Sequence, residues 1–135
     1  MRSPSRRVLV VDDHNDVADM QASLLRLCGY EVCTAYDGAS ALRMAEAFRP
    51  DVVFLDVMMP GMDGCEVSRR LRQLDSHIRI VALTALMPRA LDNDADFDGY
   101  IAKPATAREV VAAVEGPVVP PSGVRGSRDE GDEEE

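Results

Sequence analysis

One stretch, VVFLDVMMPGMDG at residues 52–64, constrains the fold of this chain more than any other. Its four apolar residues, 52–55, are typical of a strand that is buried on both faces, as in the centre of a parallel sheet. The strand leads into a carboxylate, Asp56, and Pro60 and Gly61 then force a turn. The next segment, EVSRRLRQL, has helical spacing. Asp56 is therefore predicted to lie at the mouth of a βα loop, where open α/β sheets bind ligands.

Strand and helix patterns alternate along the rest of the chain. Strands are predicted at residues 6–12, 31–36, 52–55, 78–84 and 100–102, and helices at Asp16–Leu27, from Asp37 or Gly38 to Phe48, at Glu66–Leu74 after Gly64, and at Ala105–Glu115. The first helix is expected to bury Val17, Met20, Leu24 and Leu27 and to stop at Gly29. Between Ala85 and Asp98 the pattern is irregular and weakly helical at best. This alternation predicts one five-stranded parallel sheet with helices on both faces.

Length and composition favour a single soluble domain. The chain has 135 residues, and its apolar runs are too short to span a membrane or to form a signal peptide. Residues 1–5 and the Pro-, Gly- and acid-rich residues 116–135 are expected to be disordered. The net charge is −9 and no basic stripe is visible, which argues against direct binding of nucleic acid. The three cysteines are expected to be buried reduced thiols, which indicates a cytoplasmic location.

Polar residues follow four of the predicted strands. Because the carboxyl ends of parallel strands share one edge of a sheet, these residues should converge there: Asp12, Asp13, Asp56, Thr84 and Lys103. Neighbouring carboxylates repel one another unless a cation compensates, and oxygen ligands suit Mg²⁺. Lys103 is the single lysine beside fourteen arginines, which suggests that a compact positive charge is needed at this edge. The set favours phosphoryl transfer to a carboxylate nucleophile.

Four motifs in this order, VLVVDD, FLDVMMPGMDG, ALTA and GYIAKP, resemble the receiver domain of two-component response regulators. The resemblance covers about residues 6–115. It implies a flavodoxin-like fold with strand order 2-1-3-4-5 and five helices, of which the fourth is expected to be shortened or irregular here. With no output domain visible after residue 115, the chain is expected to be a stand-alone receiver similar to chemotaxis regulators. It is also close to the receivers of hybrid kinases, so a phosphorelay role is an alternative.

The resemblance also implies roles for individual residues. Asp56 would accept a phosphoryl group from a phosphohistidine on a sensor histidine kinase or a histidine phosphotransfer protein. Mg²⁺, with Mn²⁺ as an alternative, would be bound by Asp13, Asp56 and the Met58 backbone carbonyl, and by Asp12 through water. Lys103 would bind a phosphate oxygen, Thr84 would move toward the phosphoryl group, and Tyr100 would follow it as the switch aromatic. Pro104, expected to be cis, would aim Lys103, and Pro60 and Gly64 would shape the loop. The downstream target is not specified.

Competing interpretations remain for several of these residues. Asp12 and Asp13 could simply cap a helix, and Tyr100 could be a packing residue. Residues 94–99 match the first half of an EF-hand loop, but the twelfth position is Ala105 rather than Glu. His14 and His77 are expected to be exposed, without a metal-ligand spacing.

Two other functions stay open. An aspartate-nucleophile phosphohydrolase would normally carry an acid where Met58 stands. The chain could also be a protein-interaction module that keeps the receiver fold without being phosphorylated. The receiver interpretation departs from the family pattern in the short interval of eighteen residues between Thr84 and Lys103.

Overall fold

Alternating strands and helices run the length of the computed structural model, which describes residues 6–58, 61, 64–84 and 97–115. The elements are β1 Arg7–Val11, α1 Asn15–Leu27, β2 Glu31–Ala35, α2 Gly38–Phe48, β3 Val52–Asp56, α3 Gly64–Leu74, β4 Arg79–Thr84, β5 Gly99–Ala102 and α4 Ala107–Glu115. The predicted strands are confirmed to within one residue, whereas the last helix begins two residues later than predicted. The predictions for residues 1–5, Pro60 and residues 116–135, and most of the irregular segment before Asp98, lie outside the described residues.

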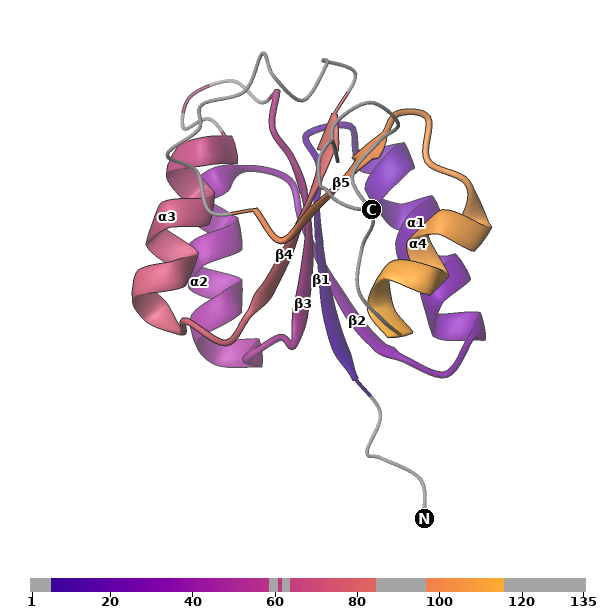
Figure 1. Cartoon of the computed structure of the whole chain (residues 1–135), viewed down its shortest axis with the longest axis horizontal. Coiled ribbons are helices and arrows are strands. Elements are labelled where there is room, and N and C mark those ends of the chain that lie inside the picture. Colours follow the sequence, from indigo (N-terminus) through magenta and orange to yellow (C-terminus); the bar gives the residue numbers. More distant parts are fainter. Residues whose placement is uncertain (1–5, 59–60, 62–63, 85–96, 116–135) are drawn as a thin grey trace, which may run out of the picture.

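The five strands form one parallel sheet with the order β2-β1-β3-β4-β5 (Figure 1). This confirms the predicted flavodoxin-like topology. Helices α2 and α3 cover one face of the sheet, and α1 and α4 cover the other. The described residues contain four helices. The remaining helix was predicted between β4 and β5, and residues 85–96 of that interval lie outside the described residues.

Alternate residues of each central strand supply two separate cores. Val8, Val10 and Phe54 face α1 and α4, while Leu9 and Leu55 face α2 and α3. All five residues of β3 are buried, as expected for a strand with a packed layer on each side. Burial of both faces fixes the register of the central strands, because a shift by one residue would exchange the two cores.

The face that α1 buries differs from the prediction. Ala18, Ala22 and Leu25 are the buried apolar residues, whereas Met20 is 66% exposed and Leu27 is 86% exposed. The apolar residues of this helix cover more than one face, and the small side chains of Ala18 and Ala22 fit against the sheet. Val17 and Leu24, which were also expected to be buried, are half-buried, so the periodicity of large apolar residues predicted only part of the buried face.

Helix ends follow local chemistry. At the end of α1, the Gly29 N–H donates to the Arg26 carbonyl and the Tyr30 N–H donates to the Leu25 carbonyl. Gly29 has φ +99°, a conformation in which glycine is favoured, and this confirms the predicted stop. At the start of α4, Thr106 and Glu109 exchange side-chain-to-backbone hydrogen bonds and form a capping box. This box explains why α4 begins after Thr106.

The prediction of buried cysteines is wrong. Cys28 is exposed, and Cys33 and Cys65 are partly exposed, although none of the three forms a disulfide within the described structure. Cys28 is the C-cap of α1, and a small side chain at a helix end is easily left exposed. Within the described part of the chain, no helix is long and apolar enough to cross a membrane.

Candidate functional site

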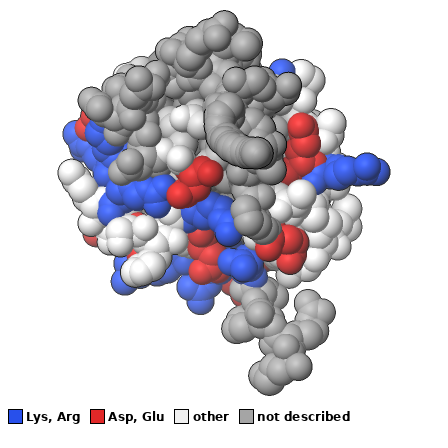
Figure 2. Space-filling model, in the orientation of Figure 1, with Lys and Arg blue, Asp and Glu red and all other residues white. Residues whose placement is uncertain are grey.

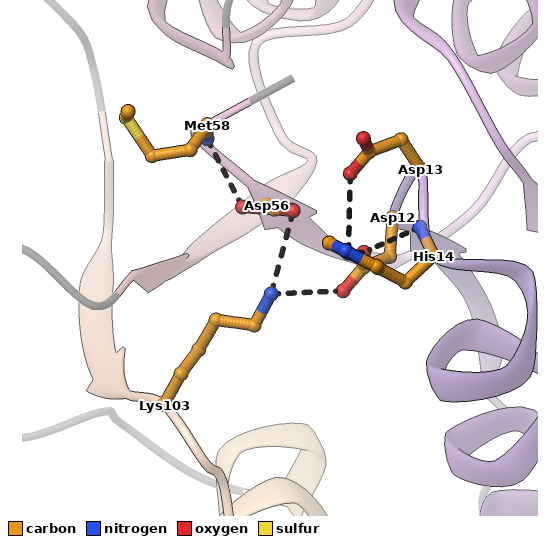
Figure 3. Close-up of polar contacts among 6 residues, drawn as sticks. All are labelled: Asp12, Asp13, His14, Asp56, Met58 and Lys103. Atoms are coloured by element: carbon orange, nitrogen blue, oxygen red, sulfur yellow. Dashed lines mark hydrogen bonds and ion pairs between the residues drawn. The ribbon is translucent and has the colours of Figure 1, made fainter. Parts of the chain in front are cut away.

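The predicted site residues come together at the carboxyl edge of the sheet (Figure 3). Parallel pairing aligns Val11 with Leu55 and Asp56 with Leu83, so the chain leaves β1, β3 and β4 at the same level. Asp12, Asp13 and His14 follow β1, Asp56 ends β3, and Lys103 follows β5. The sheet thus brings together side chains that are up to 91 positions apart in the sequence.

Asp56 is a nearly buried carboxylate, with 2% of its surface exposed. Its Oδ1 accepts a hydrogen bond of 3.0 Å from the Met58 N–H, and its Oδ2 lies 3.4 Å from the Lys103 Nζ. Burial is the main cause that raises the pKa of Asp56, and the charge of Asp12 adds to this effect. The Met58 N–H and Lys103 lower the pKa, but they do not reverse the shift.

Lys103 is the cation that holds two buried carboxylates together. Its Nζ donates to Asp12 Oδ2 at 3.1 Å and also contacts Asp56. Burial acts to lower the pKa of Lys103, but the hydrogen bond to Asp12 and the two carboxylate charges outweigh it, so the pKa is raised. The Lys103 backbone N–H donates to the Thr84 carbonyl at 2.9 Å, and the peptide bond to Pro104 is cis, as predicted.

Asp12 and Asp13 differ in how well their oxygens are satisfied. Asp12 is fully buried, and its two oxygens accept hydrogen bonds from the His14 backbone N–H and from Lys103. Asp13 is partly exposed, and its Oδ1 is buried without a hydrogen-bond partner in the described structure. A buried carboxylate oxygen is rarely left unpaired. This Asp13 oxygen accepts no hydrogen bond from the described residues and lies 3.5 Å from His14 Nδ1, so it marks a position where a cation would fit.

Ligand atoms of four side chains form a group that could hold a metal ion. One ligand atom each from Asp12, Asp13, His14 and Asp56 lies within 4.8 Å of all the others. Three carboxylates beside one lysine leave an excess of negative charge, which a divalent cation would neutralise. The residues present therefore fit a divalent metal ion. Asp12 and Asp13 do not cap α1, because the N-cap residue of this helix is His14.

The sequence-based interpretation of His14 needs correction. Its side chain is exposed, as expected, but its Nδ1 lies 3.3 Å from Asp12 Oδ1 and 3.5 Å from Asp13 Oδ1. His14 has no second His or Cys at a metal-ligand spacing, because the other three members of the group are aspartates. Two of these aspartates directly precede His14 in the sequence. His77 is exposed and stands beside Asp75, away from this group.

The remaining predicted site residues lie around this centre. Thr84 ends β4 and is buried, one position beyond the partner of Asp56. Tyr100 in β5 is partly buried against Val57 and Ala82. Burial raises the pKa of Tyr100, and its ring meets that of Phe97 edge to face at 5.7 Å.

Met58 directs its backbone N–H toward Asp56, while its side chain is 58% exposed and points away in Figure 3. The role of its carbonyl as a metal ligand stays a prediction.

The EF-hand alternative is not supported by Asp98. Its Oδ2 accepts a hydrogen bond from the Ile80 N–H and pairs with Arg72, and β5 begins at the next residue. This carboxylate links β4, α3 and β5 rather than facing an open loop. The other acids of that motif, Asp94 and Asp96, lie outside the described residues.

On the face shown in Figure 2, described basic residues are interspersed with acids and form no continuous basic stripe.

Comparison with known proteins identifies the family. Residues 8–115 match the response regulator receiver domain. The chain therefore belongs to the response regulator receiver family. PrrA of Mycobacterium tuberculosis, a transcriptional regulatory protein, is 44% identical over 113 residues, which are 82% of this chain and 48% of PrrA. The chain thus spans about half the length of this relative.

Solved structures agree with this assignment. The chemotaxis protein CheY4 of Vibrio cholerae superposes with a TM-score of 0.77 at 31% identity, covering 83% of this chain and 98% of CheY4. The response regulator TrrA of Thermotoga maritima, solved in complex with Mg²⁺ and beryllofluoride, gives a TM-score of 0.73 at 31% identity and covers 82% of this chain and 96% of TrrA. The predicted resemblance to receiver domains is confirmed.

Proposed function

We propose that this chain is a phosphorylation-activated signalling receiver in two-component signal transduction, with Asp56 as the phosphoryl acceptor. The observation that carries the proposal is the place of Asp56. It ends the central strand and is almost fully buried, with Lys103 and the carboxylate of Asp13 close by. A carboxylate kept from water beside a lysine and a cation position is arranged for in-line attack on phosphorus rather than for packing.

The transfer step follows from this arrangement. A carboxylate oxygen of Asp56 forms a bond to the phosphorus of a phosphohistidine, and the phosphorus–nitrogen bond breaks as the histidine leaves. The donor is a sensor histidine kinase or a histidine phosphotransfer protein. Lys103 neutralises one phosphoryl oxygen, because its Nζ already lies 3.4 Å from Asp56. The Met58 N–H, bonded to Oδ1, orients the carboxylate for attack by its other oxygen.

A divalent cation completes this site. Asp13, Asp56 and the Met58 carbonyl would hold Mg²⁺ directly, and Asp12 would act through water. Mn²⁺ is an acceptable replacement. The support for this division is the contrast between Asp12, whose oxygens both accept hydrogen bonds from protein donors, and Asp13, whose Oδ1 accepts no hydrogen bond within the described structure. The cation supplies charge neutralisation on the transferred oxygens.

The phosphoryl group is read out through the neighbouring strands. Thr84 moves toward the new charge, and Tyr100 moves inward and changes a surface that binds an unidentified protein target. The support is the adjacency of Thr84 to the β4 partner of Asp56, and the incomplete burial of Tyr100 against Val57 and Ala82. The chain turns over no external substrate, binds no nucleic acid directly and works in the cytoplasm.

Intact-protein mass after incubation with acetyl phosphate and Mg²⁺ tests this function. We expect a phosphoryl-sized gain in the wild type that disappears with Asp56→Asn and with EDTA. Glu46→Gln, which removes an exposed carboxylate far from the site, is the matched control and should be modified normally.

No gain in the wild type, with either acetyl phosphate or a phosphorylated histidine phosphotransfer protein, would favour the non-phosphorylated interaction module. Sustained hydrolysis of phosphate esters would instead favour a phosphohydrolase.

A further inference from the structure

His14 is held over the acidic group by its own backbone. Its N–H donates to Asp12 Oδ1 at 2.9 Å, and the residue is the N-cap of α1 with φ −88° and ψ 101°. These two features place the residue beside the acids, and the contact of Nδ1 with Asp12 Oδ1 at 3.3 Å orients the ring, although 69% of the side chain is exposed. In Figure 3 the imidazole lies beside both Asp12 and Asp13. The ring is therefore placed at the site before any ion binds.

The separations between His14 and the acids match the spacing of ligands around one ion. Nδ1 forms a long hydrogen bond of 3.3 Å with Asp12 Oδ1 and lies 3.5 Å from Asp13 Oδ1, whereas the usual N–H···O distance is about 2.9 Å. Adjacent ligand atoms bound at about 2.1 Å to one octahedral ion are roughly 3 Å apart. The Asp13 oxygen that faces the ring is the buried oxygen without a partner. A cation between these two atoms would satisfy both.

A nitrogen ligand changes which metals the site prefers. Mg²⁺ takes oxygen ligands and gains little from imidazole, whereas Co²⁺, Ni²⁺ and Zn²⁺ bind imidazole well. We propose that His14 Nδ1 is a ligand for a nitrogen-accepting divalent transition ion in the cavity where Mg²⁺ is held by oxygens alone. This inference rests on the metal site of the proposed function and deepens it. It adds a residue that selects between classes of metal.

The chain provides a matched control for this residue. His77 repeats the local arrangement of His14: its N–H donates to Asp75 Oδ1 at 2.9 Å, and its Nδ1 lies 3.6 Å from the same oxygen. It differs in having a single acid nearby and no share in the metal-like group. A histidine in this turn conformation without the other carboxylates should not bind the ion tightly.

The test is isothermal titration of the full chain with Co²⁺ and, separately, with Mg²⁺, for the wild type, His14→Gln and His77→Gln. His14→Gln should weaken Co²⁺ binding about tenfold or more, while the Mg²⁺ affinity stays within about twofold. Visible absorption of bound Co²⁺ should shift when the nitrogen ligand is lost. His77→Gln should change neither affinity nor spectrum.

Two results would overturn the proposal. One is a Co²⁺ affinity and spectrum unchanged by His14→Gln, which would make His14 only a helix cap. The other is an equal loss of Co²⁺ and Mg²⁺ binding, which would mean that the substitution disturbs Asp12 rather than removing a ligand. The proposed function fails independently of this inference. Its failure would be the absence of Asp56 phosphorylation in the wild type with Mg²⁺, whatever the titration with Co²⁺ gives.

Discussion

At the scale of single residues, the properties of Asp56 follow from opposing effects on one carboxylate. Burial raises its pKa most, and the charge of Asp12 adds to the rise. Because the pKa is higher in the folded state than in the unfolded state, ionised Asp56 destabilises the fold at pH values above both. The penalty disappears as the pH falls below the unfolded value, where Asp56 is protonated in both states.

Asp56→Asn should therefore stabilise the metal-free protein. We expect the free energy of unfolding at pH 7 to rise by about 1–2 kcal/mol, because the amide carries no charge to bury. The gain should shrink steadily as the pH approaches 4. Urea unfolding in EDTA across this range measures it, with Glu46→Gln as the control that should change stability by less than about 0.5 kcal/mol. A gain that grows on acidification would contradict the argument.

Lys103 has the opposite effect on stability. Lys103→Met leaves Asp12 and Asp56 buried without their cation, so we expect a loss of about 2–4 kcal/mol at pH 7 without metal. In the Asp56→Asn background the loss should be smaller, since only one carboxylate then lacks its partner. A double-mutant cycle by urea unfolding measures this coupling. Additive effects within about 0.5 kcal/mol would show that Lys103 and Asp56 do not interact.

At the scale of elements, the position of α3 depends on a close approach at Gly64. A Cβ built on Gly64 would lie 2.4 Å from the Val57 Cα, and the Gly64 N–H donates to the Val57 carbonyl at 3.3 Å. The conflict is with backbone, so no side-chain rotation can relieve it. The start of α3 thus rests directly on the residue that follows Asp56.

Gly64→Ala should destabilise the protein by about 2–3 kcal/mol, because α3 or the loop after β3 must move. Gly29→Ala is the matched control. Gly29 has φ +99° but no atom within 4 Å of the added methyl group, so it should lose only about 1 kcal/mol of conformational strain. Thermal unfolding of both variants compares them. Equal losses would mean that the steric contact with Val57 is relieved at no cost.

At the scale of the whole molecule, the described core and site lie between Val8 and Glu115. A chain ending at residue 117 lacks six acids and two arginines of the full sequence. We expect its free energy of unfolding to stay within about 0.5 kcal/mol of the full chain and its Mg²⁺ affinity to be unchanged. Urea unfolding and titration calorimetry measure the two. A larger loss of stability or of Mg²⁺ affinity would mean that residues 118–135 contribute to the folded domain or to its metal site.

Local patterns in the sequence predicted most of the architecture. The apolar run before Asp56 predicted a central strand, and β3 is buried along its length. The same patterns failed where one helix carried apolar residues on several sides, as at Met20 and Leu27, because periodicity does not show which side meets the sheet. They also failed for Cys28, because a small residue at a helix end can be left uncovered.

The sequence by itself determined that the strands form one parallel sheet, which edge of the sheet carries the site and which acids and lysine lie there. These follow from alternation of the elements and from residues at strand ends, which are local properties, whereas the strand order was implied by the resemblance to receiver domains. Only the tertiary structure decided that both Asp12 oxygens are occupied, that one Asp13 oxygen accepts no hydrogen bond from the described residues and that His14 joins the group. The physical reason is that hydrogen bonding and burial depend on distances between separate strands and loops, which no single stretch of sequence contains.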